Sequence, residues 1–535
     1  MSITGHVDTF AADHLPPRSA WPVFEVEGFD YPAQLNCAHA LLDGALAAGM
    51  GDRVAIESPT ERWTYAALNE VVDRLAWTLT RTLGLVPGNR VLLRGPNTPM
   101  MAAAWLAVVK AGGVAVATMP LLRERELAQI IEKARVSHAL CDARLVEAVE
   151  ALRGPESPLR SIATFGDAAR PDALEPHMAQ APGTFEACPT SAEDTCLIAF
   201  TSGTTGEPKG TMHFHRDVLA ICDAFPASCL KATRDDRFIG SPPLAFTFGL
   251  GGLLLFPLRI GATAVLIERV APDLLLEAIA RHRATVCVTS PTAYRAMAAK
   301  AAGFDLTSLR KCVSAGEALP AGTRALWRAA TGIEIIDGIG STELLHIFIS
   351  HTEDDARPGA TGKAIPGYRA CVLDDTGQPL PPGQVGRLAV RGPTGCRYLA
   401  DPRQATYVVD GWNLTGDAYL QDEDGYFHYQ ARTDDMIISA GYNIAGPEVE
   451  AALMLHPSVA ECAVVGWPDD ERGKIVKAFV VLRPEVDASE AHVAALQAFV
   501  KASIAPYKYP RAVEFVQALP RTETGKLQRF KLRGG

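Results

Sequence analysis

The sequence predicts an α/β fold: a large N-terminal domain of mixed sheets with flanking helices and a β-rich subdomain, then a small α+β C-terminal domain. Helix-like patterns alternate with short runs of β-branched residues through most of the chain, which is typical of layered α/β architectures. From residue 368 short strands separated by Gly, Pro and Asp turns take over, and a compact unit begins after residue 433. The predicted domains are therefore residues 1–433, with the β-rich part at about 368–431, and residues 434–535.

The layers of the N-terminal domain are predicted from amphipathic helices that are each followed by a strand. A helix between two strands is the usual connection in a parallel sheet, so we expect largely parallel sheets. The helix and strand pairs are 68–83 with 90–94, 100–110 with 113–117, 274–283 with 285–289, and 320–331 with 334–337.

From residue 368 on, the sequence pattern changes from alternating helices and strands to short strands and turns. Strand-like pieces at 369–373, 387–391 and 426–429 are separated by turns, which indicates an antiparallel β subdomain. The C-terminal unit then alternates short elements and ends in a tail rich in Lys, Arg and Gly. Its expected helices are 447–455 and 490–503, and its expected strands are 459–467 and 477–482.

Composition excludes several classes of protein. Of the 535 residues, 48% are apolar and 21% are charged, close to the average for a globular protein. The chain has 51 Lys and Arg against 61 Asp and Glu, a net charge of −10, so it lacks the dense positive charge that nucleic acids or anionic membranes require. The most apolar run, 245–258, is interrupted by Gly and Pro and is shorter than the ~20 residues of a membrane span.

Cysteine usage predicts reduced thiols. The 11 cysteines are scattered singly with no C-x-x-C pair, which argues against structural zinc and against a disulfide scaffold. The N-terminal residues show no charged start followed by an apolar run, so no signal peptide is expected. A cytoplasmic protein is therefore expected.

The strongest local signal is a glycine-rich loop, TSGTTGEPKG, at 201–210 after an apolar strand at 196–200. Backbone N–H groups beside glycines, several hydroxyls and one ammonium group suit a polyphosphate. It is not a Walker A loop, and its alternative interpretation is a flexible surface loop. The predicted phosphate contacts are Thr201, Ser202, Gly203, Thr204, Thr205, Gly206 and Lys209.

This loop resembles the signature of the adenylate-forming superfamily, which includes acyl- and aryl-CoA synthetases, peptide-synthetase adenylation domains and beetle luciferase. Other motifs resemble that family in the same order along the chain, so the chain is identified as a member. They are KAGG at 110–113, SAGE at 314–317, GIGSTE at 338–343, TGD at 415–417, the hinge segment from 432 to 444, and PRTETGK at 520–526.

The resemblance implies an ATP site. It assigns Asp417 and Arg432 to the ribose, Thr342 and Glu343 to the α-phosphate, and Glu343 to Mg²⁺; a carboxylate that begins a helix is the alternative for Glu343. Lys526 would bridge the substrate carboxylate and the α-phosphate. Lys209, Thr342, Glu343 and Lys526 are the expected catalytic residues. Further nucleotide contacts are expected at Gly316, Glu317, Asp337, Gly338 and Ile339, where Ile339 replaces a common aromatic residue.

The resemblance also implies a mobile C-terminal domain that turns between two half-reactions. Asp434 corresponds to the hinge position. Ala440 and Gly441 correspond to the small residues that line the CoA tunnel, although Gly441 could equally be a turn glycine.

The acid pocket resembles that of benzoate-type CoA ligases. Its expected residues are Phe246, Thr247, Phe248, Gly249, Ala315, Gly340, His346 and Ile347. Thr247 could bond an ortho substituent, and TMHFHRD at 211–217 resembles the 2-aminobenzoate (anthranilate) branch. The alternatives are core packing for the two phenylalanines and a buried, hydrogen-bonded role for His346. His213 and His215 are interpreted as structural residues at a helix start, without metal-ligand partners.

The expected function is an aryl-CoA ligase that uses ATP, Mg²⁺ and CoA and acts on 2-aminobenzoate or benzoate. The nearer alternative loads an aryl acid onto a separate carrier protein. An alternative of another class is a non-catalytic nucleotide-binding regulatory protein. No nucleic-acid or membrane partner is expected, and the sequence sets no oligomeric state.

Overall fold

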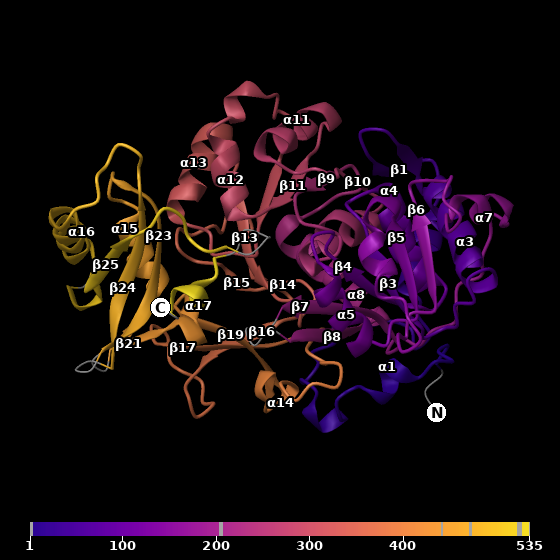
Figure 1. Cartoon of the computed structure of the whole chain (residues 1–535), viewed down its shortest axis with the longest axis horizontal. Helices are drawn as coiled ribbons and strands as arrows, with labels where there is room; N and C mark the ends of the chain where they lie inside the picture. The colour runs from indigo at the N-terminus through magenta and orange to yellow at the C-terminus, as the bar shows by residue number, and fades with distance from the viewer. Residues whose placement is uncertain are drawn as a thin grey trace. The chain divides into compact units, whose positions relative to one another are not determined.

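The computed structural model describes residues 4–202, 207–439, 442–469, 473–504, 506–521 and 527–533 (Figure 1). Contacts divide the chain into two compact units. The first consists of Met1–Ala370 with Val390–Asn413, and the second of Cys371–Ala389 with Leu414–Gly535. The predicted domain division at residue 434 stays a prediction.

The larger sheet of the first unit has nine strands in the order β15-β14-β13-β12-β11-β9-β10-β1-β2. Its central pairs are parallel, whereas β2, β14 and β15 pair antiparallel at the edges. Its strands are β1 (Val54–Glu57), β2 (Arg62–Thr64), β9 (Arg237–Gly240), β10 (Thr263–Val265), β11 (Val286–Thr289), β12 (Lys311–Ser314), β13 (Ile335–Gly340), β14 (Ile347–Ser350) and β15 (Lys363–Ala364).

The second sheet of this unit has six strands in the order β6-β5-β3-β4-β7-β8. Strands β3 to β7 pair in parallel, and β7 and β8 form an antiparallel hairpin. The glycine-rich loop connects the two strands of that hairpin. The strands are β3 (Arg90–Arg94), β4 (Val114–Thr118), β5 (His138–Asp142), β6 (Ser161–Phe165), β7 (Thr195–Ser202) and β8 (Pro208–Phe214).

Helices pack against these sheets, and their ends follow local sequence signals. Thr64 and Thr98 accept backbone N–H groups at the starts of α3 and α4, and Pro99 is favourable in the first turn of α4. The longer helices are α2 (Cys37–Ala47), α3 (Tyr65–Arg81), α4 (Pro99–Lys110), α5 (Glu124–Lys133), α8 (His215–Phe225), α11 (Pro272–His282), α12 (Pro291–Ala298) and α13 (Ala321–Thr331). The shorter ones are α1 (Phe10–Asp13), α6 (Glu147–Glu150), α7 (Glu175–Gln180), α9 (Thr247–Leu250), α10 (Phe256–Ile260) and α14 (Gln404–Tyr407).

A five-stranded sheet has the order β16-β17-β19-β18, with β20 also beside β19. The division between the units crosses β16, β17 and β19. Of the other two strands, β18 belongs to the first unit and β20 to the second. The strands of the five-stranded sheet are β16 (Arg369–Leu373), β17 (Val385–Arg391), β18 (Val408–Val409), β19 (Trp412–Gln421) and β20 (Phe427–Arg432).

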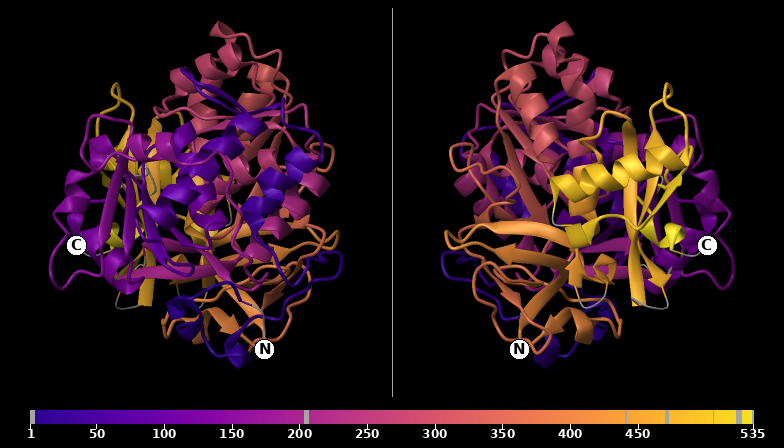
Figure 2. Two further views of the ribbon diagram at one scale, coloured as in Figure 1. Left: turned by 90° about the vertical axis from the view of Figure 1, so that its right-hand side faces the viewer. Right: turned by 90° about the vertical axis from the view of Figure 1, so that its left-hand side faces the viewer.

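The C-terminal part of the second unit has a core of its own. Strand β24 pairs antiparallel with β23 and parallel with β25, and α16 lies across this sheet (Figure 2). Leu496 and Val500 of α16 pack with Val464 and Val480 of the strands. The elements are β21 (Ile437–Ser439), β22 (Tyr442–Ile444), α15 (Gly446–Leu453), β23 (Val459–Asp469), β24 (Gly473–Leu482), α16 (Glu490–Ser503), β25 (Ala512–Phe515) and α17 (Arg529–Leu532).

The predicted fold class is confirmed: the chain is a mixed α/β protein with several sheets. Strand β3 matches its expected range, and the predicted helices are shifted by only a few residues. The apolar run 245–258 contains α9 and part of α10, and its residues 249–258 are buried in the core. Among the described residues, no helix is both long and apolar enough to span a bilayer.

Candidate functional site

The β7–β8 hairpin presents the ends of the glycine-rich loop. Thr201 lies opposite Lys209, and Ser202 lies opposite Pro208. The Lys133 ammonium donates to the Pro208 carbonyl at 2.9 Å and pairs with Asp401 at 2.7 Å, which fixes the start of β8. Gly203, Thr204, Thr205 and Gly206 lie outside the described residues, as does the side chain of Ser202. A strand hairpin is a rigid support for a phosphate loop, because its register fixes both loop ends.

Lys209, Tyr398 and Glu343 come together from three separate segments of the first unit. The Tyr398 hydroxyl donates to Glu343 Oε1 at 2.6 Å, and Lys209 Nζ lies 5.3 Å from the Tyr398 ring centroid. Burial and the Glu343 charge raise the pKa of Tyr398, so the phenol stays protonated and remains a donor. Sequence analysis missed Tyr398, because an isolated tyrosine between motifs carries no distinctive pattern.

The segment from Thr342 to His346 is a turn that leads into β14. Leu344 N–H donates to Ser341 Oγ at 3.2 Å, and Leu345 adopts a left-handed conformation with φ 70°. Because no helix begins here, the alternative reading of Glu343 as a helix-start carboxylate is wrong. The Thr342 carbonyl is bonded by His213 Nε2 at 2.8 Å, which ties this turn to β8.

The adjacent ends of β12 and β13 carry several predicted nucleotide contacts. Ser314 of β12 lies opposite Asp337 of β13, so the residues that follow them, Ala315 to Glu317 and Gly338 to Gly340, continue from neighbouring strand ends. Gly316 has φ 89°, which favours glycine, and Glu317 accepts from Thr292 Oγ1 at 2.7 Å. The carboxyl ends of parallel strands are the usual ligand edge of an α/β sheet.

Asp337 is a buried carboxyl at this edge. Its Oδ1 has no hydrogen-bond partner within the described structure, while its carbonyl accepts from Ser350 Oγ at 2.6 Å. Burial raises the pKa of Asp337 to about 7, against the opposing effect of the Arg324 charge. A buried carboxyl with a raised pKa is a common feature of functional sites.

His346 is the centre of the predicted acid pocket. Its Nε2 lies 3.4 Å from the Phe248 carbonyl, and its ring centroid lies 5.6 Å from that of Phe248 and 4.5 Å from that of Phe256. Burial lowers the pKa of His346 to about 3, so the ring is neutral. His346 is therefore a buried, hydrogen-bonded histidine, which was the alternative to its interpretation as an acid-pocket residue.

Three positions around this histidine have no room for a side chain larger than that of glycine. A Cβ at Gly251 would lie 2.4 Å from His346 Cδ2, one at Gly340 would lie 2.7 Å from the His346 carbonyl carbon, and one at Gly249 would lie 2.1 Å from the Pro243 carbonyl oxygen. Phe246 is 37% exposed, so its interpretation as core is wrong.

The other acid-pocket candidates lie on nearby elements. Thr247 begins α9, directly before Phe248. Ile347 is a buried residue of β14 and lies opposite Gly340 across the strand pair. Ala315 is buried at the end of β12. Ile339 is paired with Ile349.

In the second unit, Asp417 and Arg432 lie opposite each other on β19 and β20. Arg432 Nη1 donates to Asp417 Oδ1 and to the Thr415 carbonyl, both at 3.1 Å. Gly416, with φ 75°, leaves room for the guanidinium, since a Cβ there would lie 2.6 Å from Arg432 Nη2. The pair places an acceptor beside a cation, an arrangement that suits ribose hydroxyls.

Four further residues predicted to belong to the site are described only in part or not at all. Lys526, Ala440 and Gly441 lie outside the described residues, and so does the side chain of Asp434. The backbone of Asp434 belongs to a short helical turn, Thr433–Asp435, directly after β20.

Glu343 fits the hard-oxygen chemistry that Mg²⁺ prefers. Its carboxylate is half-buried, and the hydrogen bond from Tyr398 fixes one oxygen and with it the orientation of the group. Phosphate oxygens bound beside Lys209 would supply the further oxygen ligands of such a site.

Two expectations about histidines need correction. His213 lies within β8 and not at a helix start, because the strand continues to Phe214. His215 does begin α8, but the expectation that it has no metal-ligand partners is wrong: Cys37 and Cys196 lie beside it. Sequence spacing could not show this group, since its members come from distant segments.

Comparisons with known proteins cover nearly the whole chain. The family model described as AMP-binding enzyme matches residues 45–398, and that of the AMP-binding enzyme C-terminal domain matches residues 448–526. Benzoate–CoA ligase of Thauera aromatica is 38% identical over 511 residues, which cover 94% of this chain and 96% of the relative.

Solved structures agree with this likeness. The anthranilate CoA ligase AuaEII in complex with anthranoyl-AMP matches with a TM-score of 0.88 and 35% identity, over 94% of this chain and 97% of that one. A benzoate CoA ligase from Burkholderia xenovorans LB400 matches with a TM-score of 0.83 and 33% identity, over 93% of this chain and 100% of that one.

Proposed function

The chain belongs to the AMP-binding enzyme family, and from that membership we propose that it is an AMP-forming aryl-CoA ligase whose acid is 2-aminobenzoate or benzoate. The observation that carries the proposal is the convergence of Lys209, Tyr398 and Glu343 beside the phosphate loop. That arrangement supplies a cation and an oriented carboxylate where a polyphosphate would lie.

In the first half-reaction, a carboxylate oxygen of the acid attacks the α-phosphorus of ATP, and pyrophosphate leaves. Negative charge grows on the leaving oxygens, so Lys209, the loop donors and Lys526 lower the barrier by stabilising it. Mg²⁺ held at Glu343 would supply charge neutralisation and orient the phosphates. The Asp417 and Arg432 pair would hold the ribose.

In the second half-reaction, the CoA thiol loses its proton and its sulfur attacks the carbonyl carbon of the aryl-adenylate, and AMP leaves with the electron pair of the broken C–O bond. Rotation at Asp434 and a tunnel at Ala440 and Gly441 are the predicted means of admitting the thiol. No side-chain nucleophile is required. The cytoplasmic location remains a prediction.

The choice of acid is supported by the pocket residues. Phe248 and the neutral His346 ring lie 5.6 Å apart, and this aromatic pair would suit a benzene ring better than a flexible alkyl chain. Thr247 precedes them at the start of α9, and its hydroxyl would accept from a 2-amino group. The likeness to an anthranilate CoA ligase supports the same choice.

The test measures kcat/KM for thioester formation with benzoate, 2-aminobenzoate, 2-hydroxybenzoate, 4-hydroxybenzoate and octanoate. We expect 2-aminobenzoate or benzoate to lead the series and octanoate to trail by at least about 100-fold. Adenylate formation without transfer to CoA would favour the alternative, an enzyme that loads a carrier protein. ATP binding with no turnover of any acid would favour the regulatory alternative.

A further inference from the structure

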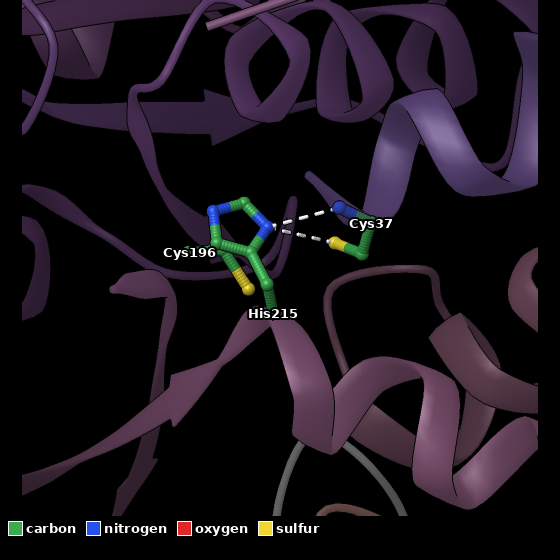
Figure 3. A group of neighbouring side chains, drawn as sticks. All are labelled: Cys37, Cys196 and His215. Atoms are coloured by element: carbon green, nitrogen blue, oxygen red, sulfur yellow. Dashed lines mark hydrogen bonds between the residues drawn. The ribbon is translucent and has the colours of Figure 1, made fainter. Parts of the chain in front are cut away.

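Three buried side chains, none of them assigned to the ligase reaction, meet in the first unit. The sulfur atoms of Cys37 and Cys196 and a ring nitrogen of His215 all lie within 4.8 Å of one another (Figure 3). All three residues have essentially no exposed surface. Within the described ranges, no second group of His, Cys, Asp and Glu gathers in this way.

The three side chains come from two helix starts and one strand irregularity. Cys37 is the first residue of α2, and His215 is the first residue of α8. Cys196 lies at an irregularity of β7, because the pairing with β8 shifts register between Thr195 and Leu197. Such a bulge redirects a side chain out of the regular alternation of a strand. Helix starts and bulges hold their side chains rigidly, so the group is preformed.

The distances suit a single ion. Zinc bonds of about 2.3 Å to sulfur and about 2.0 Å to nitrogen place the ligand atoms of a tetrahedral site about 3.5 to 3.8 Å apart. His215 Nδ1 lies 3.2 Å from Cys37 Sγ and 3.1 Å from Cys37 N. The ligand atoms lie at most 4.8 Å from one another, so shifts of up to about an ångström would seat an ion in three of four tetrahedral positions, with the Cys37 N–H released from Nδ1.

The group is incompletely satisfied as a hydrogen-bonded cluster. His215 Nε2 is buried and has no hydrogen-bond partner in the described part of the chain. Cys196 Sγ donates to the His213 carbonyl at 3.6 Å, a long contact for a hydrogen bond from sulfur. Thiolates are the ligands that a soft metal ion binds.

We propose that Cys37, Cys196 and His215 Nδ1 form a structural site for a divalent thiophilic cation such as Zn²⁺. Two thiolates and a neutral imidazole cancel the charge of a divalent ion, whereas a monovalent ion would leave a net charge in a fully buried place. The ion would cross-link α2 to the base of the β7–β8 hairpin. That hairpin carries the phosphate loop, so the site would stiffen the support of the loop.

The experiment uses the full-length protein without an affinity tag, reduced, loaded with Zn²⁺ and then dialysed against metal-free buffer. Elemental analysis should find about one zinc per chain. Cys37→Ala and Cys196→Ala should each lower zinc retention at least about tenfold. Cys222→Ala is the matched control, since Cys222 is a fully buried cysteine of α8 outside the group, and it should retain zinc fully.

A second measurement does not depend on the variants folding. Co²⁺ added to the reduced wild-type protein should give thiolate-to-cobalt charge-transfer absorption, and Zn²⁺ should abolish it. Absence of that absorption, zinc retention that the two cysteine variants leave unchanged, or a Cys37–Cys196 disulfide in a chain that binds no zinc after reduction would each overturn the proposal. These results are independent of ligase activity, so they do not depend on the proposed function.

Discussion

Tyr398 orients the Glu343 carboxylate, which is expected to face the phosphates. Its hydroxyl donates to Glu343 at 2.6 Å, and a hydrogen bond to a charged group contributes about 1.5–3 kcal/mol. Tyr398→Phe should lower kcat/KM for adenylation about tenfold and raise the Mg²⁺ concentration needed for half-maximal rate. Initial rates against Mg²⁺ and ATP measure both.

The matched control is Tyr31→Phe, which removes a hydrogen bond of 2.8 Å between a tyrosine hydroxyl and the Asp223 carboxylate. This substitution should leave the Mg²⁺ dependence unchanged. If both variants change the kinetics alike, Tyr398 supports the fold and does not orient Glu343.

Asp337 gives a prediction for pH and stability. Its pKa is raised by burial from 3.8 to about 7 in the folded state, so the folded protein binds a proton more tightly than the unfolded chain. Stability from this group is complete below the unfolded pKa and is lost as pH rises towards 7. We therefore compare the Tm of Asp337→Asn minus the Tm of wild type at two pH values. This difference should be more positive at pH 8 than at pH 5.

The control for this prediction is Asp236, whose pKa is lowered. Burial opposes that shift, but hydrogen bonds from Arg310 and Thr285 outweigh burial and stabilise the ionised carboxylate. Asp236→Asn should therefore lower Tm at pH 8. A relative Tm of Asp337→Asn that does not change with pH would contradict a protonated Asp337.

At the scale of elements, a glycine within β19 shapes the predicted ribose contact. Gly416 has φ 75°, and a Cβ there would lie 2.6 Å from Arg432 Nη2. Gly416→Ala should displace the guanidinium and raise KM for ATP several-fold, with a smaller effect on kcat. Steady-state kinetics with varied ATP measure the split.

Gly425→Ala is the control for Gly416→Ala, because both substitutions put a Cβ on a residue with positive φ. Gly425 has φ 86° in the same unit, but the nearest atom to a Cβ there, Gln421 Nε2, is 3.8 Å away. Both variants should lose similar stability, and only Gly416→Ala should raise KM. An equal rise in both would assign the effect to strain and not to Arg432.

Elements with strong local patterns could be predicted, while sites that depend on tertiary contacts could not. Strand β3 and helix α4 follow from apolar runs with clear stops, and the fold class follows from their alternation. His213 was placed on the wrong element, because β8 runs directly into α8 without a loop. The Cys37, Cys196 and His215 group and the bond from Tyr398 to Glu343 join distant segments, for which local spacing holds no signal.

At the scale of the whole molecule, the two half-reactions should depend on different parts of the chain. Lys526 lies beyond the described residues, and family resemblance assigns it to adenylation alone. Lys526→Ala should lower adenylate formation by at least about 1000-fold but leave thioester formation from supplied aryl-adenylate nearly unchanged. Single-turnover assays of each step measure this. Equal loss of both steps would contradict the assignment.

The most direct test of the ligase is exchange of labelled pyrophosphate into ATP without CoA. Adenylation is reversible, so the purified protein with Mg²⁺ should catalyse this exchange only when 2-aminobenzoate or benzoate is present. Addition of CoA should then convert the adenylate into one aryl-CoA thioester for each AMP released. Exchange that needs no acid, or no exchange with any aromatic acid, would contradict the proposal that this chain is an aryl-CoA ligase.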